Sequence, residues 1–295
     1  MRRNGFSSGR MHSQAEKAEA FRALHHGDRM LVLPNAWDVP SARVFEDAGF
    51  PAVATSSAGL MVSLGYPDGE GMPRRELVAG VGRIARKVSV PLSADVVAGF
   101  GRTPRAVTAT VRMMLQAGAV GINLEDLDPS GHGLVPEAMQ VRKLEAIRRL
   151  GRSMGIPLVI NARTDALRHG PGDEAERLRE AIRRSIAYRD AGSDCVYPMG
   201  LTDPEPISTF VQTLRCPVNV MVRKGLPPVA ELEKLGVKRL SFGPAASYAT
   251  MGLLRRASRE VLDHGTFDSL VEGAINYDDL NRLALARDPP GRRAG

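Results

Sequence analysis

Eight short apolar runs recur along the chain, and longer amphipathic segments separate them. The runs are continuous rather than alternating, which is typical of parallel strands covered on both faces. The segments between them have helical spacing and begin at capping residues such as Asp38 and Asp173. Three end in Ala-Gly, at 48–49, 117–118 and 191–192, where glycine lets the chain turn sharply into a strand. We expect strands at 30–34, 52–55, 91–95, 120–125, 157–163, 194–198, 217–221 and 238–243.

Eight consecutive strand–helix units with short connections predict a (β/α)8 TIM barrel of the α/β class. An open doubly wound sheet is the competing architecture, but it needs only about five or six strands and usually begins with a glycine-rich turn. The first turn here reads PNAWDVPS and has no glycine. We also expect a helix at 14–25, before the first strand, and two helices at 244–264 and 276–286, after the eighth.

The composition predicts one globular domain between two basic tails. Apolar residues make up 43% of the chain and charged residues 25%, which is ordinary for a globular protein. The net charge of +7 would suit nucleic acid, but residues 1–10 and 287–295 carry five of these charges. We therefore expect basic disordered tails at 1–13 and 287–295, a single barrel domain with C-terminal helices at 14–286, and no nucleic-acid partner.

Two further features favour a cytoplasmic protein with no membrane partner. No apolar run approaches the roughly 18 residues of a transmembrane helix, and the N-terminal segment lacks the apolar centre of a secretory signal. Cys195 falls in a predicted buried strand and Cys216 directly precedes another, and neither belongs to a CxxC pattern. A disulfide framework and a structural zinc site are therefore not expected, and the compartment is expected to be reducing.

Polar residues follow almost every apolar run, where a (β/α)8 barrel has its active site. Helix capping is the interpretation we favour for Asp38 and Asp165. Asp95, Glu125 and Arg163 differ because each lies at the end of an apolar run, where burial is costly without a metal or an ion partner. Two carboxylates suit Mg²⁺, and a guanidinium suits a planar substrate carboxylate.

Other residue types narrow the chemistry. The TSSAGL segment after the second run could direct backbone N–H groups at an anionic oxygen. No pair of the six histidines has the spacing of a metal site, but His132 lies in a strand-end loop and is a candidate for proton transfer. None of the six lysines directly ends a predicted strand, so metal-assisted enolate chemistry is preferred to a Schiff base.

The same residues resemble the isocitrate lyase/phosphoenolpyruvate mutase superfamily over roughly residues 28–243. The matching segments are LPNAWDVPSARVFEDAGFPAVATSS, LGYPDG, PLSADVVAGFG, GINLED, NARTDA and YRDAGSDCVYP. The resemblance implies a Mg²⁺-dependent barrel, with Mn²⁺ as an alternative ion. It also implies a homotetramer that exchanges a C-terminal helix, and a small carboxylate substrate that reacts through a pyruvate-like enolate.

Carried over by position, the resemblance implies that Asp95 binds the metal directly and Glu125 binds it through water. Arg163 would bind the substrate carboxylate, and Tyr197 joins His132 as a candidate proton donor. The full substrate-binding set that we expect is Trp37, Thr55, Ser56, Ser57, Asp68, Arg163 and Asn219.

Two departures from the family pattern separate this chain from its relatives. The second acid after Asp95 is replaced by Val97, and the loop after the fourth strand, DLDPSGHGLVPEAM, has neither the usual Lys nor the usual Cys. His132 is our prediction for the missing acid.

We expect a carbon–carbon lyase for a small 2-hydroxy or 2-keto di- or tricarboxylate, similar to isocitrate or methylisocitrate lyase or cleaving oxaloacetate. One alternative is a P–C bond enzyme, either a phosphoenolpyruvate mutase or a phosphonopyruvate hydrolase. The other is a catalytically lapsed barrel that serves as a binding protein.

Overall fold

The computed structural model describes residues 13–131 and 133–285. Within them the strand pairs are all parallel, as the continuous apolar runs predict. The strands are β1 (Leu31–Leu33), β2 (Asn35–Ala36), β3 (Val53–Thr55), β4 (Leu92–Asp95), β5 (Gly121–Glu125), β6 (Val159–Thr164), β7 (Cys195–Pro198), β8 (Asn219–Met221) and β9 (Arg239–Ser241).

The strands close into the expected (β/α)8 barrel. Strands β2 to β7 pair in chain order, and β9 pairs with both β1 and β8. A parallel bridge between Val196 and Val218 joins β7 to β8. The first predicted strand, 30–34, ends at Pro34, which has no N–H for a ladder, and in the structure the chain is divided between two sheets here. Strand β1 precedes the proline and pairs with β9, whereas β2, which was not predicted, follows it and pairs with β3. Asn35 spans the division, because its side-chain amide donates to Thr55 O and its Oδ1 accepts from the Phe242 and Gly243 N–H groups, each at 2.9 Å.

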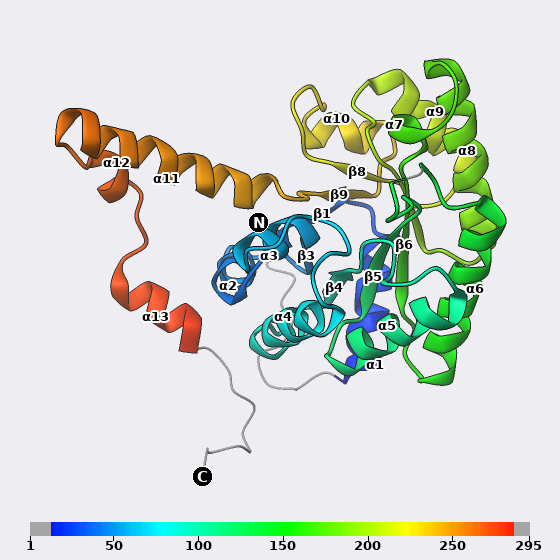
Figure 1. The fold of residues 1–295 in the computed structure, drawn as a ribbon, viewed down its shortest axis with the longest axis horizontal. Helices are drawn as coiled ribbons and strands as arrows, with labels where there is room; N and C mark the ends of the chain where they lie inside the picture. The colour runs from blue at the N-terminus through cyan, green and yellow to red at the C-terminus, as the bar shows by residue number, and fades with distance from the viewer. Residues whose placement is uncertain (1–12, 132, 286–295) are drawn as a thin grey trace, which may run out of the picture.

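Helices surround the barrel (Figure 1). The Asp38 capping box begins the second helix, and Gly49, Gly118 and Gly192 have φ values of 97°, 105° and 96° where helices turn into strands. The helices are α1 (Gln14–Leu24), α2 (Val39–Asp47), α3 (Ser57–Ser63), α4 (Arg74–Lys87), α5 (Pro104–Gln116), α6 (Glu137–Ser153), α7 (Ala166–His169), α8 (Glu174–Asp190), α9 (Pro204–Leu214), α10 (Val229–Lys234), α11 (Ala245–His264), α12 (Asp268–Val271) and α13 (Tyr277–Leu285).

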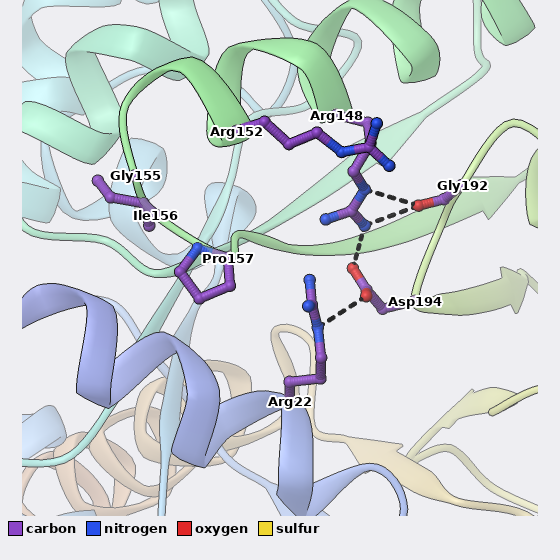
Figure 2. Close-up of a pocket in the computed structure, with 8 residues that line it drawn as sticks. All are labelled: Arg22, Arg148, Arg152, Gly155, Ile156, Pro157, Gly192 and Asp194. Carbon is purple, nitrogen blue, oxygen red and sulfur yellow. Dashed lines mark hydrogen bonds and ion pairs between the residues drawn. The ribbon is translucent and has the colours of Figure 1, made fainter.

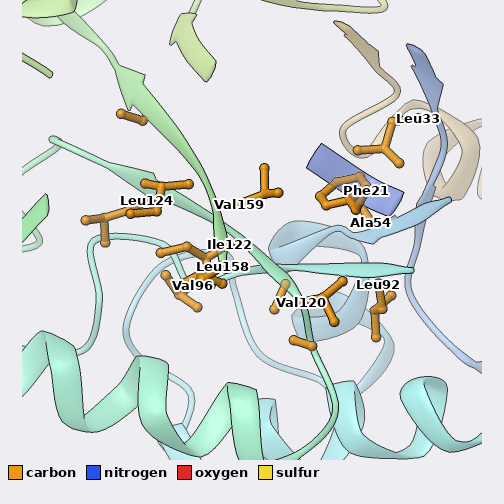
Figure 3. Close-up of a cluster of buried hydrophobic side chains, with 14 of the residues drawn as sticks. Phe21, Leu33, Ala54, Leu92, Val96, Val120, Ile122, Leu124, Leu158 and Val159 are labelled. Carbon is orange, nitrogen blue, oxygen red and sulfur yellow. The ribbon is translucent and has the colours of Figure 1, made fainter. Parts of the chain in front are cut away.

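Helix α1 closes the N-terminal end of the barrel. Phe21 is fully buried among the strand side chains in Figure 3, and a Cβ on Gly121 would lie 2.6 Å from its ring. Glycine is therefore required at 121 for the ring to enter. His25, also fully buried, has Nδ1 2.8 Å from Phe21 O and Nε2 3.4 Å from the Arg239 guanidinium. Burial and that guanidinium lower the pKa of His25 from 6.5 to about 3, so the ring is neutral.

The barrel interior is polar at the opposite end. Register pairs Asp95 with Asn123 and Asn123 with Asn161, while Glu125 pairs with Arg163 one layer further along. Directly paired residues point to the same side of a sheet, so these side chains face inward together. The C-terminal strand ends therefore bring together Asp95, Glu125 and Arg163.

A helical arm leaves the barrel after β9 (Figure 1). Only Ser247 and Ala257 are buried in α11, which is 20 residues long, and α13 returns to α2 through an Arg282–Asp47 ion pair of 3.3 Å. The exposed large apolar side chains of α11 are Tyr248, Met251, Leu253, Leu254, Val261 and Leu262. Over residues 13–131 and 133–285, no helix combines the length and the apolar character needed to cross a bilayer.

Candidate active site

Asp95 is held in a fixed orientation at the end of β4. Its Oδ1 accepts hydrogen bonds from Asn123 Nδ2 and from the Val97 N–H, each at 3.2 Å, and its Oδ2 lies 3.4 Å from the Ser57 N–H. Its own N–H donates to Thr55 Oγ1 at 2.9 Å. Thr55 therefore supports Asp95 from the neighbouring strand, which is a different contact from the substrate contact that the sequence predicts.

Arg163 lies between two carboxylates. Its Nε and Nη2 donate to Asp165 Oδ2 and Oδ1 at 2.7 and 2.8 Å, and its Nη1 is 2.9 Å from Glu125 Oε2. The guanidinium carbon is 5.9 Å from the centre of the Tyr197 ring. These carboxylates outweigh the effect of burial and raise the pKa of Arg163 well above its ordinary value. The cation is thus permanent, and each terminal nitrogen keeps a second N–H for another ligand.

The capping role predicted for Asp165 is wrong. It precedes α7 without a capping hydrogen bond from its side chain, and both carboxylate oxygens bind Arg163 instead. Charge explains the difference, because the buried Arg163 guanidinium requires a nearby anion, while the Ala166 N–H at the start of α7 lies 3.3 Å from Thr164 Oγ1 instead.

Asp126 lies behind this pair and fixes the Asp165 backbone. Its carboxylate accepts from the Asp165 N–H and Thr164 Oγ1 at 2.8 Å each, from the Tyr188 hydroxyl at 2.7 Å and from Arg184 Nη1 at 3.1 Å. Arg184 and Tyr188 come from α8 and were not predicted. Tyr188 begins the matching segment YRDAGSDCVYP, but neither it nor Arg184, one turn earlier in the same amphipathic helix, was singled out as a site residue.

The carboxylates of the site repel one another. Burial raises the pKa of Glu125 to about 8, and Asp165, Asp95 and Asp68 add to the rise, while Arg163 opposes it. The pKa of Asp68 is raised by burial and then by Asp95, against a hydrogen bond from Ser57. Asp68, Asp95 and Glu125 are thus close enough to repel one another, and Arg163, the arginine beside them, is already paired.

This donor set fits a hydrated magnesium ion better than a metal bound only by protein. Among residues 13–131 and 133–285, no three His, Cys, Asp or Glu side chains converge closely enough to hold an ion by themselves. Mg²⁺ binds through one or two carboxylates and keeps several waters, and its charge would relieve the repulsion among Asp68, Asp95 and Glu125. Val97 cannot contribute, because it is an apolar, 95% buried residue with its N–H directed at Asp95.

Several predicted contacts take other partners in the structure. The Ser56 N–H donates to Ala36 O at 2.9 Å, and Ser56 Oγ caps α3, so the prediction that its backbone donor faces a substrate is wrong. Asn219 is fully buried, and its side-chain amide is 3.1 Å from Ser241 Oγ. Trp37 is half-buried against the Gly59 backbone.

Of the two candidate proton donors, the structure describes Tyr197. Tyr197 is 5% exposed, its hydroxyl lies 2.8 Å from Met199 Sδ, and burial raises its pKa above the ordinary value. His132 lies outside the described residues.

Comparison with known proteins gives consistent relatives. The sequence profile of the family described as phosphoenolpyruvate phosphomutase matches residues 21–262. The 2-methylisocitrate lyase of Bacillus subtilis is 29% identical over 265 residues, covering 86% of this chain and 84% of the relative.

Two solved structures share the fold over nearly their whole length. A candidate lyase/mutase from Burkholderia cenocepacia J2315 is 37% identical with a TM-score of 0.86, covering 93% of this chain and 98% of that one. A 2,3-dimethylmalate lyase, described as a PEP mutase/isocitrate lyase superfamily member, is 28% identical with a TM-score of 0.79, covering 91% and 94%.

Proposed function

Because the chain belongs to the phosphoenolpyruvate phosphomutase family, within the PEP mutase/isocitrate lyase superfamily, it is an enzyme, and we propose that it cleaves a carbon–carbon bond in a small 2-hydroxy or 2-keto di- or tricarboxylate. Arg163 carries the proposal. Its guanidinium is held by Asp165 and Glu125 beside the carboxylate cluster, with N–H groups left for a substrate carboxylate.

We propose that Asp95 is the direct ligand of a Mg²⁺ ion, which Mn²⁺ can replace. Glu125 and Asp68 would contact the ion through water. The fixed orientation of Asp95 supports this role, since ordered ligands lower the cost of binding. When bound, the ion would supply positive charge beside the substrate's oxygen atoms.

The bond cleavage that we propose needs two proton transfers. A base takes the proton of the substrate hydroxyl, whose carbon becomes the carbonyl of the keto-acid product as the adjacent C–C bond breaks. The electron pair of that bond moves into an enolate of the departing carboxylate fragment, and an acid returns a proton to the enolate carbon. We assign the acid to His132, whose neighbours Gly131 and Gly133 have φ values of 80° and 86°, a conformation that favours glycine. Tyr197, beside Arg163, is the second candidate.

P–C bond chemistry is the second candidate function, and the family's description as a phosphomutase favours it. The same arginine and metal ligands would hold phosphonopyruvate as a mutase or a hydrolase does. A change in the ³¹P NMR signal of phosphonopyruvate when it is incubated with the enzyme would support this reaction over C–C cleavage.

A substrate panel tests the proposal. Isocitrate, 2-methylisocitrate, 2,3-dimethylmalate and oxaloacetate are incubated with the enzyme and Mg²⁺ or Mn²⁺, and the keto acid, oxalate and partner acid released are measured. Turnover of one of them that EDTA abolishes supports the lyase. If no member is cleaved and phosphonopyruvate is unchanged, but oxalate binds with Mg²⁺ in calorimetry, the barrel is a binding protein and the proposal is wrong.

We also propose a homo-oligomer, a tetramer as the resemblance implies, in which a second copy covers the apolar side chains of α11. Single-domain organisation over 14–286, basic tails at 1–13 and 287–295, and a cytoplasmic location complete the proposal. The free thiols of Cys195 and Cys216 support a reducing compartment.

A further inference from the structure

A hollow lies at the end of the barrel opposite the carboxylate cluster. It has a volume of about 580 Å³ and opens between α1, the end of α6 and the turns that lead into β6 and β7. Its lining contains three arginines and one acid (Figure 2), and consists of Arg22, Arg148, Arg152, Gly155, Ile156, Pro157, Gly192 and Asp194. The proposed catalytic reaction uses none of these residues.

Arg22 and Arg148 are fixed in place around Asp194. Figure 2 shows them reaching its carboxylate from opposite sides, Arg22 Nε at 3.1 Å from Oδ1 and an Arg148 terminal nitrogen bonded to Oδ2. Arg148 also donates to Gly192 O at 2.7 and 3.0 Å and to Leu158 O at 2.6 Å. Both guanidinium groups are therefore preorganised, because an Asp and main-chain carbonyls hold them before any ligand arrives.

Asp194 cannot neutralise this cluster. Its carboxylate is shared by two arginines and also accepts the Ile160 N–H at 2.7 Å. Arg22 Nε is buried with no well-aligned hydrogen bond, although the Asp194 oxygen is close enough for an ion pair. The pair of arginines therefore keeps a net positive charge, in a place where Arg22 is 31% exposed and Arg148 is 13% exposed.

Arg152 adds a second uncompensated charge. It is exposed one turn after Arg148, and no hydrogen bond or ion pair links its side chain to another described residue. The negative end of α6 does not offset it, because the carbonyls of Leu150, Gly151 and Arg152 accept N–H groups of residues 154–156. The hollow thus presents a surplus of two positive charges.

We propose that this hollow binds the phosphate group of a small phosphorylated metabolite. A phosphate monoester is a dianion near neutral pH, so it matches the surplus, and its tetrahedral oxygens suit guanidinium groups that converge from two helices. The side chains of Ile156 and Pro157 give the rest of such a ligand an apolar surface. The hollow also has the volume typical of a small-molecule site.

Isothermal calorimetry with inorganic phosphate tests the proposal. The parent is compared with Arg152→Gln and with a matched control, Arg149→Gln, which removes the same charge from the same helix. Arg149 is 68% exposed, pairs with Glu145 at 3.7 Å and does not line the hollow. We expect one saturable site that weakens as NaCl is raised, a loss of about tenfold or more in affinity for Arg152→Gln, and a change of less than about twofold for Arg149→Gln.

Three results would overturn the proposal. The parent could lack saturable phosphate binding, the two variants could lose affinity equally, or malonate, a dicarboxylate, could bind as tightly as phosphate. Equal losses would mean that net charge alone attracts the anion, and tight malonate binding would mean that the site selects carboxylates. Because the test measures binding only, it is independent of whether the enzyme is a lyase.

Discussion

Arg163 and Asp165 form a two-bond ion pair at the mouth of the barrel, with N···O distances of 2.7 and 2.8 Å. The Nε–Nη2 edge of the guanidinium is therefore occupied by Asp165. A substrate carboxylate would bind the remaining N–H groups of the two terminal nitrogens. Glu125 at 2.9 Å and the Tyr197 ring restrict that approach further.

The first prediction is that Asp165→Asn lowers kcat/KM by about 10- to 100-fold, since an amide supplies only one acceptor and leaves Arg163 free to rotate. Asp173→Asn removes an exposed capping carboxylate and should leave kcat/KM unchanged. Steady-state kinetics and calorimetry with oxalate measure the effect. Unaltered kinetics in Asp165→Asn would mean that the pair is only structural.

Arg163→Lys is expected to lower kcat/KM by roughly 100-fold although the charge is kept. An ammonium cannot bind Asp165 and Glu125 and still offer parallel N–H groups to a carboxylate. Arg168→Lys, in α7, is the comparison variant. Parental kinetics for Arg163→Lys would exclude the proposed carboxylate clamp.

Metal binding should depend most on Asp95. Asp95→Ala is expected to abolish the joint binding of Mg²⁺ and oxalate in calorimetry, and Glu125→Ala should weaken it less because its contact is through water. Val97→Asp is expected to strengthen binding of Mg²⁺ alone. Val97 has φ 54°, which a β-branched residue tolerates poorly and Asp tolerates better. Joint binding that survives in Asp95→Ala would mean that the metal site is elsewhere.

The fourth prediction concerns stability at acid pH. His25 is neutral when folded because its pKa is lowered from 6.5 to about 3, whereas the unfolded chain binds its proton below pH 6.5. Stability from this residue is thus complete above pH 6.5 and is lost as the pH falls toward 3, by about 2 kcal/mol at pH 5.

Urea unfolding at pH 7.5 and pH 5 measures this loss. His25→Asn, whose amide can keep the bond to Phe21 O, should show a smaller difference between the two pH values, while His264→Gln, at an exposed residue, should behave as the parent. Equal pH dependence in His25→Asn and the parent would exclude His25 as the cause.

The last prediction concerns the arm. If a second copy covers α11, Leu254→Asp combined with Met251→Asp should reduce the assembly to a smaller species in light scattering. These side chains are 48% and 49% exposed in the single chain. Arg255→Asp, on the same helix, should keep the parental mass. A parent that is already monomeric would contradict the proposed oligomer.

The sequence predicts the barrel and the end of it that carries the site, because apolar runs, caps and Ala-Gly turns are local signals. The contact of Asn219 could not be predicted, since its partner Ser241 lies on another strand. Asp165 binds Arg163 only two residues away, but the sequence alone does not show that Arg163 is buried and therefore requires an anion beside it. Arg184 and Tyr188 illustrate the same point. Their role arises only when α8 packs against the buried carboxylate of Asp126.

Pro34 limited the strand prediction in a different way. The predicted run, 30–34, ends at this proline, but in the structure Asn35 and Ala36 form a further short strand, β2, which pairs with β3 whereas β1 pairs with β9. The Asn35 side chain links the two sheets at this point, because it donates to Thr55 O and accepts from the Phe242 N–H. A periodic pattern reports burial and does not report which neighbour a strand bonds.

Phe21 and helix α1, which carries it, close the N-terminal end of the barrel. In the proposed cleavage, the substrate and both products therefore enter and leave through the same opening, at the C-terminal strand ends. The fragment nearer the mouth has to depart first, and fresh substrate arriving before the deeper fragment leaves would trap it in a dead-end complex. Ordered release of the two products, with inhibition at high substrate concentration, is the kinetic behaviour expected of a barrel that is closed at one end.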